Sequence, residues 1–179
     1  MADLTSLLAK FLQTLSSSVS VPGILNVNVT AVGNVGTGED DLITYTLPAS
    51  QLATTGQGLR IRAWGTLAGT ANAKTIIFYF GTAAVETEVV GDAAITANLV
   101  TGQWQLEALV VKTGSSTQTI VVHLVTMMGG TAAIRDVTET RDIVSATQTD
   151  TSTIAIKCTG TATANNDIVQ SGLIVEGLI

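Results

Sequence analysis

The sequence predicts an all-β protein: a jelly-roll-like antiparallel β-sandwich of about eight to ten strands, preceded by a short N-terminal amphipathic helix. Three observations lead to this fold class. From Ile24 onward, apolar residues recur with a period of two, in runs rich in β-branched and aromatic residues. Gly, Asn, Ser and Asp bound these runs, as turn residues do. No helical period separates the runs, which excludes a βαβ arrangement.

The predicted organisation is a helical arm with an extended linker over residues 1–22, then one β-sandwich domain over residues 23–179. Six large apolar residues of the arm share one stripe of a helix: Leu4, Leu7, Leu8, Phe11, Leu12 and Leu15. A helix of about a dozen residues is marginal in water, so the stripe must be buried. It covers the open end of its own β domain, or it packs against sister subunits or a larger assembly. We expect it to be the anchoring or oligomerising element.

Ten segments of the β region are predicted as strands. Eight have a clear period of two, namely residues 24–30, 42–47, 59–67, 75–80, 104–112, 119–127, 154–161 and 168–175. Shorter segments at 85–90 and 135–144 are predicted as edge strands. Turns are predicted at 36–38, 55–58, 114–116 and 165–167, where Gly, Ser and Asn cluster.

Two strands carry polar residues whose faces can be assigned by alternation. Arg60 and Arg62 share one face of their strand with Trp64, and we expect the arginines to pair with carboxylates, such as those of residues 39–41, or to face solvent. The strand at 119–127 is apolar on both faces, which predicts burial on both sides, between a core and a neighbouring subunit. His123 in that strand is therefore expected to be a buried, hydrogen-bonded histidine.

Composition argues against several classes of partner. Lys and Arg total 8 against 14 Asp and Glu, and the net charge of -6 opposes binding to nucleic acid or to anionic membranes. Charged residues form 12% of the chain, where about 25% is usual. Such a surface is neutral and rich in hydroxyl groups, and part of it is expected to be hidden against partners.

The motifs of common catalytic and metal sites are missing, so we expect a non-enzymatic protein with no catalytic residues, cofactor or metal. Cys158 is expected to be a buried, inert thiol. The acidic residues 39–41 lack the alternate oxygen spacing of a calcium loop. The glycines of residues 33–38 lack the lysine and helix that follow a phosphate loop.

Residues 29–81 carry a recognisable pattern. An acidic turn at 39–41 precedes a Tyr-x-Leu-Pro strand end at 45–48. A glycine-bounded strand then ends in Ala63-Trp64-Gly65, and Asn72-x-Lys74-Thr75 begins an aromatic strand. The pattern resembles a β-sandwich module found in structural proteins of tailed bacteriophages. The resemblance carries over no catalytic residues.

This resemblance implies a virion structural protein, made in the host cytoplasm and placed on the particle surface. The expected form is a homotrimeric capsid decoration or head-fibre subunit, whose partners are its own copies and other virion proteins such as the major capsid protein. The alternative is a tail-fibre host-recognition module that binds a cell-surface glycan. Loops carrying Trp104, Asn72, Asn98 or Asn165 would then form the binding site.

Overall fold

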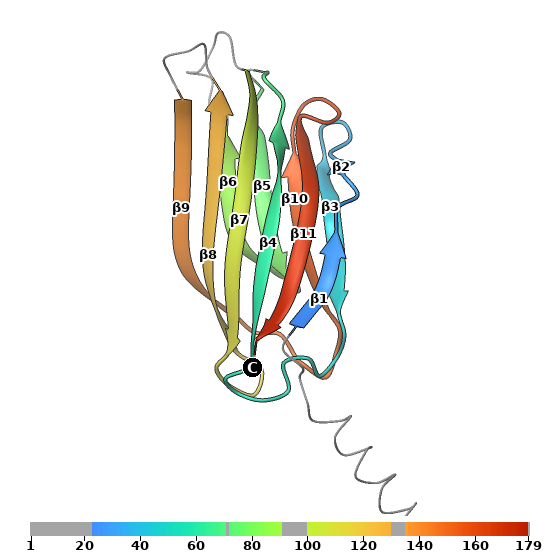
Figure 1. Cartoon of the computed structure of the whole chain (residues 1–179), viewed down its shortest axis with the longest axis vertical. Helices are drawn as coiled ribbons and strands as arrows, with labels where there is room; N and C mark the ends of the chain where they lie inside the picture. The colour runs from blue at the N-terminus through green and yellow to red at the C-terminus, as the bar shows by residue number, and fades with distance from the viewer. Residues whose placement is uncertain (1–22, 71, 91–99, 130–134, 179) are drawn as a thin grey trace, which may run out of the picture.

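The structure is a computed structural model that describes residues 23–70, 72–90, 100–129 and 135–178. This part of the chain is all-β and forms two antiparallel sheets packed face to face, so the predicted β-sandwich is confirmed (Figure 1). The predicted helical arm, with its six apolar residues, lies outside the described residues, as does Asn98.

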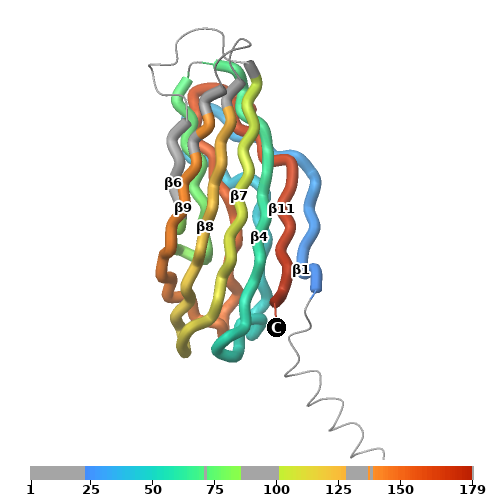
Figure 2. Tube along the Cα trace, turned by 60° about the vertical axis from the view of Figure 1, so that its left-hand side comes forward, coloured from blue at the N-terminus to red at the C-terminus, as the bar shows by residue number. Residues whose placement is uncertain are grey.

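The larger sheet has seven strands in the order β1-β11-β4-β7-β8-β9, with β2 also pairing with β11 (Figure 2). Its strands are β1 (Gly23–Asn28), β2 (Val32–Gly33), β4 (Gly58–Leu67), β7 (Val100–Lys112), β8 (Gln118–Gly129), β9 (Arg135–Ala146) and β11 (Ile168–Leu178). The smaller sheet has four strands in the order β3-β10-β5-β6. They are β3 (Glu39–Leu47), β5 (Lys74–Phe80), β6 (Ala83–Val90) and β10 (Ile154–Thr161).

The strands pair in a nested order. The first strand, β1, pairs with the last, β11, and β3 pairs with β10, then β4 with β7, and β5 with β6. Successive pairs alternate between the two sheets, so the chain wraps around the core. In chain order, the hairpin of β8 and β9 follows β7 and precedes β10. It pairs with β7 and so widens the larger sheet.

Alternating burial explains why these segments are strands. Along β5 the side chains alternate between buried and partly exposed, with Ile76, Phe78 and Phe80 in the core. Each of the predicted strand segments overlaps an observed strand, and the predicted turns lie between strands, apart from Gly58, which begins β4. The two-residue strand β2 was not predicted, because a segment that short has no measurable period.

Two buried lysines, one near each end of the sandwich, have hydrogen-bond acceptors. Near the end where β1 begins, Lys112 donates from Nζ to Oδ2 of Asp150 at 2.6 Å. At the opposite end, Lys74 donates from Nζ to the backbone oxygens of Thr70 and Asn72 at 3.0 and 2.8 Å. Burial lowers the pKa of Lys74, but these acceptors satisfy its ammonium group.

Trp104 is a core residue and not a loop residue, so the prediction of a ligand loop at Trp104 is wrong. It lies in β7, is 2% exposed, and donates from Nε1 to the backbone oxygen of Val169 at 3.2 Å. Because β4 lies between β7 and β11, the indole must cross β4. It does so at Gly65, which is paired with Trp104 and has no side chain to obstruct it.

Cys158 is buried in β10, as predicted, and burial raises the pKa of its thiol to about 12. A thiol with that pKa is protonated at neutral pH, whereas the thiolate is the reactive form. The location therefore favours a packing role.

Candidate functional site

The outer face of the larger sheet is the most distinctive surface of the described chain. It carries a line of three exposed apolar side chains, here called the apolar row: Leu109, Val121 and Ile143. Strand register places Leu109 opposite Val121 and Val121 opposite Ile143, so the row crosses β7, β8 and β9. The three residues are 37%, 44% and 71% exposed. The sequence predicts that the strand at 119–127, which lies in β8, is buried on both sides. In the isolated chain only the inner face of this strand is buried.

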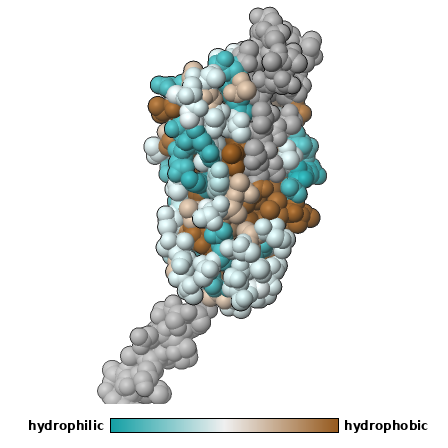
Figure 3. All heavy atoms as spheres, turned by 180° about the vertical axis from the view of Figure 1, so that it is seen from behind, coloured by the Kyte–Doolittle hydropathy of each residue, from teal (hydrophilic) through white to brown (hydrophobic). Residues whose placement is uncertain are grey.

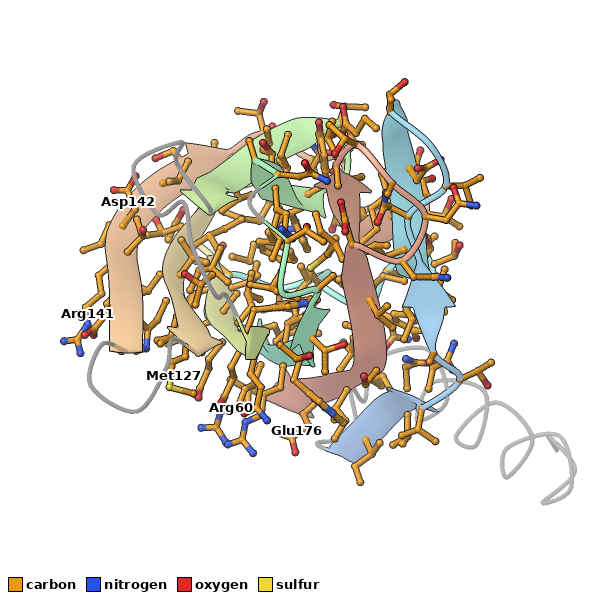
Figure 4. The ribbon with its side chains drawn as sticks, turned by 90° about the horizontal axis from the view of Figure 1, so that it is seen from above. Arg60, Met127, Arg141, Asp142 and Glu176 are labelled. Carbon is orange, nitrogen blue, oxygen red and sulfur yellow. The ribbon has the colours of Figure 1, made fainter. Side chains whose placement is uncertain are left out.

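Ion pairs occupy the same outer face beside the apolar row. Arg60 lies 3.6 Å from Glu176 and 3.9 Å from Glu107, and Arg62 lies 3.9 Å from Glu107. Figure 4 shows Arg60 and Glu176 projecting together from the side of the sheet that faces away from the core. The arginines therefore do pair with carboxylates and stay partly exposed, but their partners are not residues 39–41, because those acids belong to β3 of the other sheet.

His123 also lies on this outer face and is not buried as predicted, since its side chain is 39% exposed. Its Nε2 lies 2.8 Å from Oε1 of Glu139, but off the line of an N–H···O hydrogen bond. Arg141 donates from Nε to the same oxygen at 2.6 Å, and this hydrogen bond lowers the pKa of Glu139. Arg141 therefore favours an ionised Glu139.

A depression of about 590 Å³ opens on the same outer face, toward the end of the sandwich where β4 ends and β7 begins. We call it the Trp64 groove, and seven polar or aromatic residues line it: Arg62, Trp64, Thr66, Gln103, Trp104, Gln105 and Ser171. Val125 and Met127 of β8 add an apolar border. Register explains the grouping, since Trp64 is paired with Gln105 and Thr66 with Gln103.

Trp64 lies flat on the sheet. A Cβ added at Gly172 of β11 would be 2.1 Å from Cζ2 and 2.5 Å from both Cε2 and Cη2 of the indole. A point in the ring plane beyond Cζ2 would be much farther from the two flanking carbons than from Cζ2 itself, so distances of 2.1 and 2.5 Å place the Cβ over the face of the ring. One face of the indole therefore covers the backbone at Gly172, and the other face points away from the sheet.

The outer face of the smaller sheet is different in chemistry. Figure 3 views the molecule from that side, and most of the described surface is white or teal, the colours of intermediate and hydrophilic residues. Its charged groups bind one another: Lys157 donates to Asp41 and lies 5.3 Å from the ring centre of Tyr79. Tyr79 and Thr159 donate to Oε1 of Glu39 at 2.9 and 2.8 Å.

Of the asparagines predicted to lie on ligand loops, Asn72 and Asn165 are among the described residues. Asn165 accepts a hydrogen bond from the backbone N–H of Gly36 at 2.7 Å, and Asn72 donates to Asp167 at 3.3 Å. Both asparagines lie at the end of the sandwich opposite to Gly23, where they bind neighbouring loops. Their hydrogen bonds stabilise these loops, and neither asparagine lines the Trp64 groove.

Sequence reasoning missed the Trp64 groove. The available signal was the alternation that put Trp64 on an outward face with Arg60 and Arg62. Its glutamines could not be assigned to that site, because their pairing with β4 depends on strand order.

Within residues 23–178, gaps excluded, no group of three or more His, Cys, Asp and Glu side chains could hold a metal ion. No helix of the described residues is long and apolar enough to cross a membrane. No protein-family model and no curated protein sequence matches the chain.

Proposed function

We propose that the chain is a structural subunit of a bacteriophage particle surface, a homo-oligomeric capsid decoration or head-fibre protein for which a trimer is the expected form. The observation that carries the assembly part of the proposal is the apolar row on the outer face of the larger sheet. A residue such as Ile143, which is 71% exposed on a long strand, loses contact with water when a partner covers it.

A second copy of the chain is the partner that fits this face. The ion pairs around the apolar row use three arginines and three glutamates: Arg60, Arg62, Arg141, Glu107, Glu139 and Glu176. Their charges cancel, so two such faces do not repel each other. The low charge of the whole chain, 12% of residues, supports the same conclusion.

The virion part of the proposal rests on the resemblance of residues 29–81 to phage β-sandwich modules. The nested strand pairs support a jelly roll, extended by the β8–β9 hairpin. In this proposal the protein has no enzymatic activity, and the arm of residues 1–22 anchors the subunit to the particle.

The assembly proposal is tested by measuring the mass of the purified full chain by light scattering. We expect an oligomer, and we expect Ile143→Asp to dissociate it by placing a charge in the apolar row. Thr44→Asp is the matched control, because it places the same charge on an exposed position of the smaller sheet. A monomeric wild-type chain at micromolar concentration would refute self-assembly, and an Ile143→Asp variant with wild-type mass would refute the assigned face.

The arm is tested in the same measurement with a chain that lacks residues 1–18. Loss of incorporation into particles, or a weaker oligomer, with an unchanged melting temperature is expected. Unfolding of the shortened chain would mean that the arm belongs to the core of the domain.

A further inference from the structure

We propose that the Trp64 groove is a binding site for a polysaccharide, with one pyranose ring stacked on the exposed face of Trp64. The proposal goes beyond assembly and involves different residues of the same sheet. It starts from the orientation of the indole. Because the ring lies on the backbone at Gly172, its position is fixed before any ligand arrives.

A flat, outward-facing indole matches the chemistry of a sugar ring. The C–H groups on one side of a pyranose form an apolar surface that packs on an aromatic face, while its hydroxyl groups remain at the rim. In the groove, the rim is polar on both sides of Trp64: Gln105 is its register partner on β7, and Ser171 lies next to Gly172 on β11.

The polar groups of the rim are available to a ligand. Within the described chain, the side chains of Gln103, Gln105, Thr66 and Ser171 make no hydrogen bond to protein, whereas the buried glutamines Gln118 and Gln170 each make two. An amide both donates and accepts, which suits the hydroxyl groups of sugars. Arg62 adds a guanidinium donor whose nearest carboxylate, on Glu107, is 3.9 Å away.

The dimensions of the groove also fit a short stretch of polysaccharide. Arg62 and Thr66 are four residues apart on β4, a length of about 13 Å, or roughly two sugar rings. The volume of about 590 Å³ lies in the range of small-molecule sites. Arg62 is the one charged residue that lines the groove, so a neutral or weakly acidic sugar is favoured over a cationic one.

The chain's two tryptophans provide the readout. In a nitrogen-isotope-labelled full chain, each indole N–H gives its own NMR signal, and the Trp64 signal is identified by its loss in Trp64→Ala. Maltohexaose, cellohexaose, xylohexaose and chitohexaose are added separately at millimolar concentration. We expect at least one of them to shift the Trp64 signal more than the signal of Trp104, which also lines the groove but is 2% exposed and bonded to Val169.

Substitutions then test the assigned contacts. Gln105→Ala should weaken binding about fivefold, as expected for the loss of one hydrogen bond, without affecting folding, because Gln105 binds no protein group. Trp64→Ala should weaken binding about tenfold or more, measured by calorimetry. Thr119→Ala, on the same face but outside the groove, is the control and should bind as wild type.

The proposal is overturned if none of the four sugars shifts the Trp64 signal, or if Trp64→Ala and Gln105→Ala bind a sugar as tightly as wild type. It is also overturned if sugars have no effect and Trp64→Ala dissociates the oligomer, since the groove would then be a subunit contact. Failure of the assembly proposal gives a different result, namely a monomer that still binds the sugar.

Discussion

The crossing of Trp104 over Gly65 makes a sharp prediction about stability. Replacing Gly65 with alanine would put a methyl group 1.8 Å from the backbone oxygen of Val169 and 2.6 Å from Nε1 of Trp104. Both distances are far below van der Waals contact, and two of the three nearest atoms belong to backbone. The strands or the indole must therefore move.

The magnitude follows from two contributions. Overpacking of a core by one methyl group costs about 1–3 kcal/mol. Displacing Trp104 also breaks its 3.2 Å hydrogen bond to Val169, at about 0.5–1.5 kcal/mol. We expect Gly65→Ala to lower the free energy of unfolding by about 2–4 kcal/mol, which corresponds to a decrease of roughly 5–15 °C in melting temperature for a chain of this size.

Urea and thermal unfolding followed by circular dichroism, at one fixed protein concentration, provide the measurement. Gly38→Ala is the control, because a Cβ there would meet nothing within 4 Å and its backbone is not left-handed. That variant should unfold within about 0.5 kcal/mol of wild type. If Gly65→Ala unfolds together with Gly38→Ala, the described crossing of Trp104 over β4 is wrong.

Two further predictions concern buried groups. Lys112 lowers the pKa of Asp150 below its usual 3.8, so the pair stabilises the folded chain above that pH and this contribution is lost as pH falls through the folded pKa. Asp150→Asn should therefore be less stable than wild type at neutral pH, and its free energy of unfolding, measured with urea, should fall less than that of wild type below about pH 4. An equal fall for the two chains below that pH would contradict this. Cys158 should react with a thiol reagent at pH 8 only after unfolding, and rapid labelling of the folded chain would show that the thiol is accessible. Cys158→Ser should lower the free energy of unfolding by about 1–3 kcal/mol.

The β-sandwich could be predicted because its signals are local. A strand with one buried face needs a period of two in its own residues, and Gly, Asn or Ser ends it, as β5 illustrates. The outer face could not be predicted, since it depends on which strands are neighbours. The partners of Arg60, for example, come from β7 and β11, far along the chain.

His123 and Trp104 show how the same limit affects single residues. His123 lies among apolar neighbours in β8, which indicates burial, but that face of the strand carries no layer above it in the isolated chain. The sequence makes Trp104 a candidate ligand residue because aromatic residues bind sugars, whereas its place on the inner face of β7 depends on the register with Gly65. Composition could not distinguish the buried Trp104 from the partly exposed Trp64.

The pairing of β1 with β11 has a mechanical consequence. Gly23 lies opposite Gly177, so the described chain enters and leaves the sandwich at the same end. Tension that separates the two ends would act at one end of this ladder and peel its hydrogen bonds apart in sequence, instead of loading them all at once. The loops around Asn34 and Asp167 lie at the far end of the sandwich, away from the end at which that tension would act.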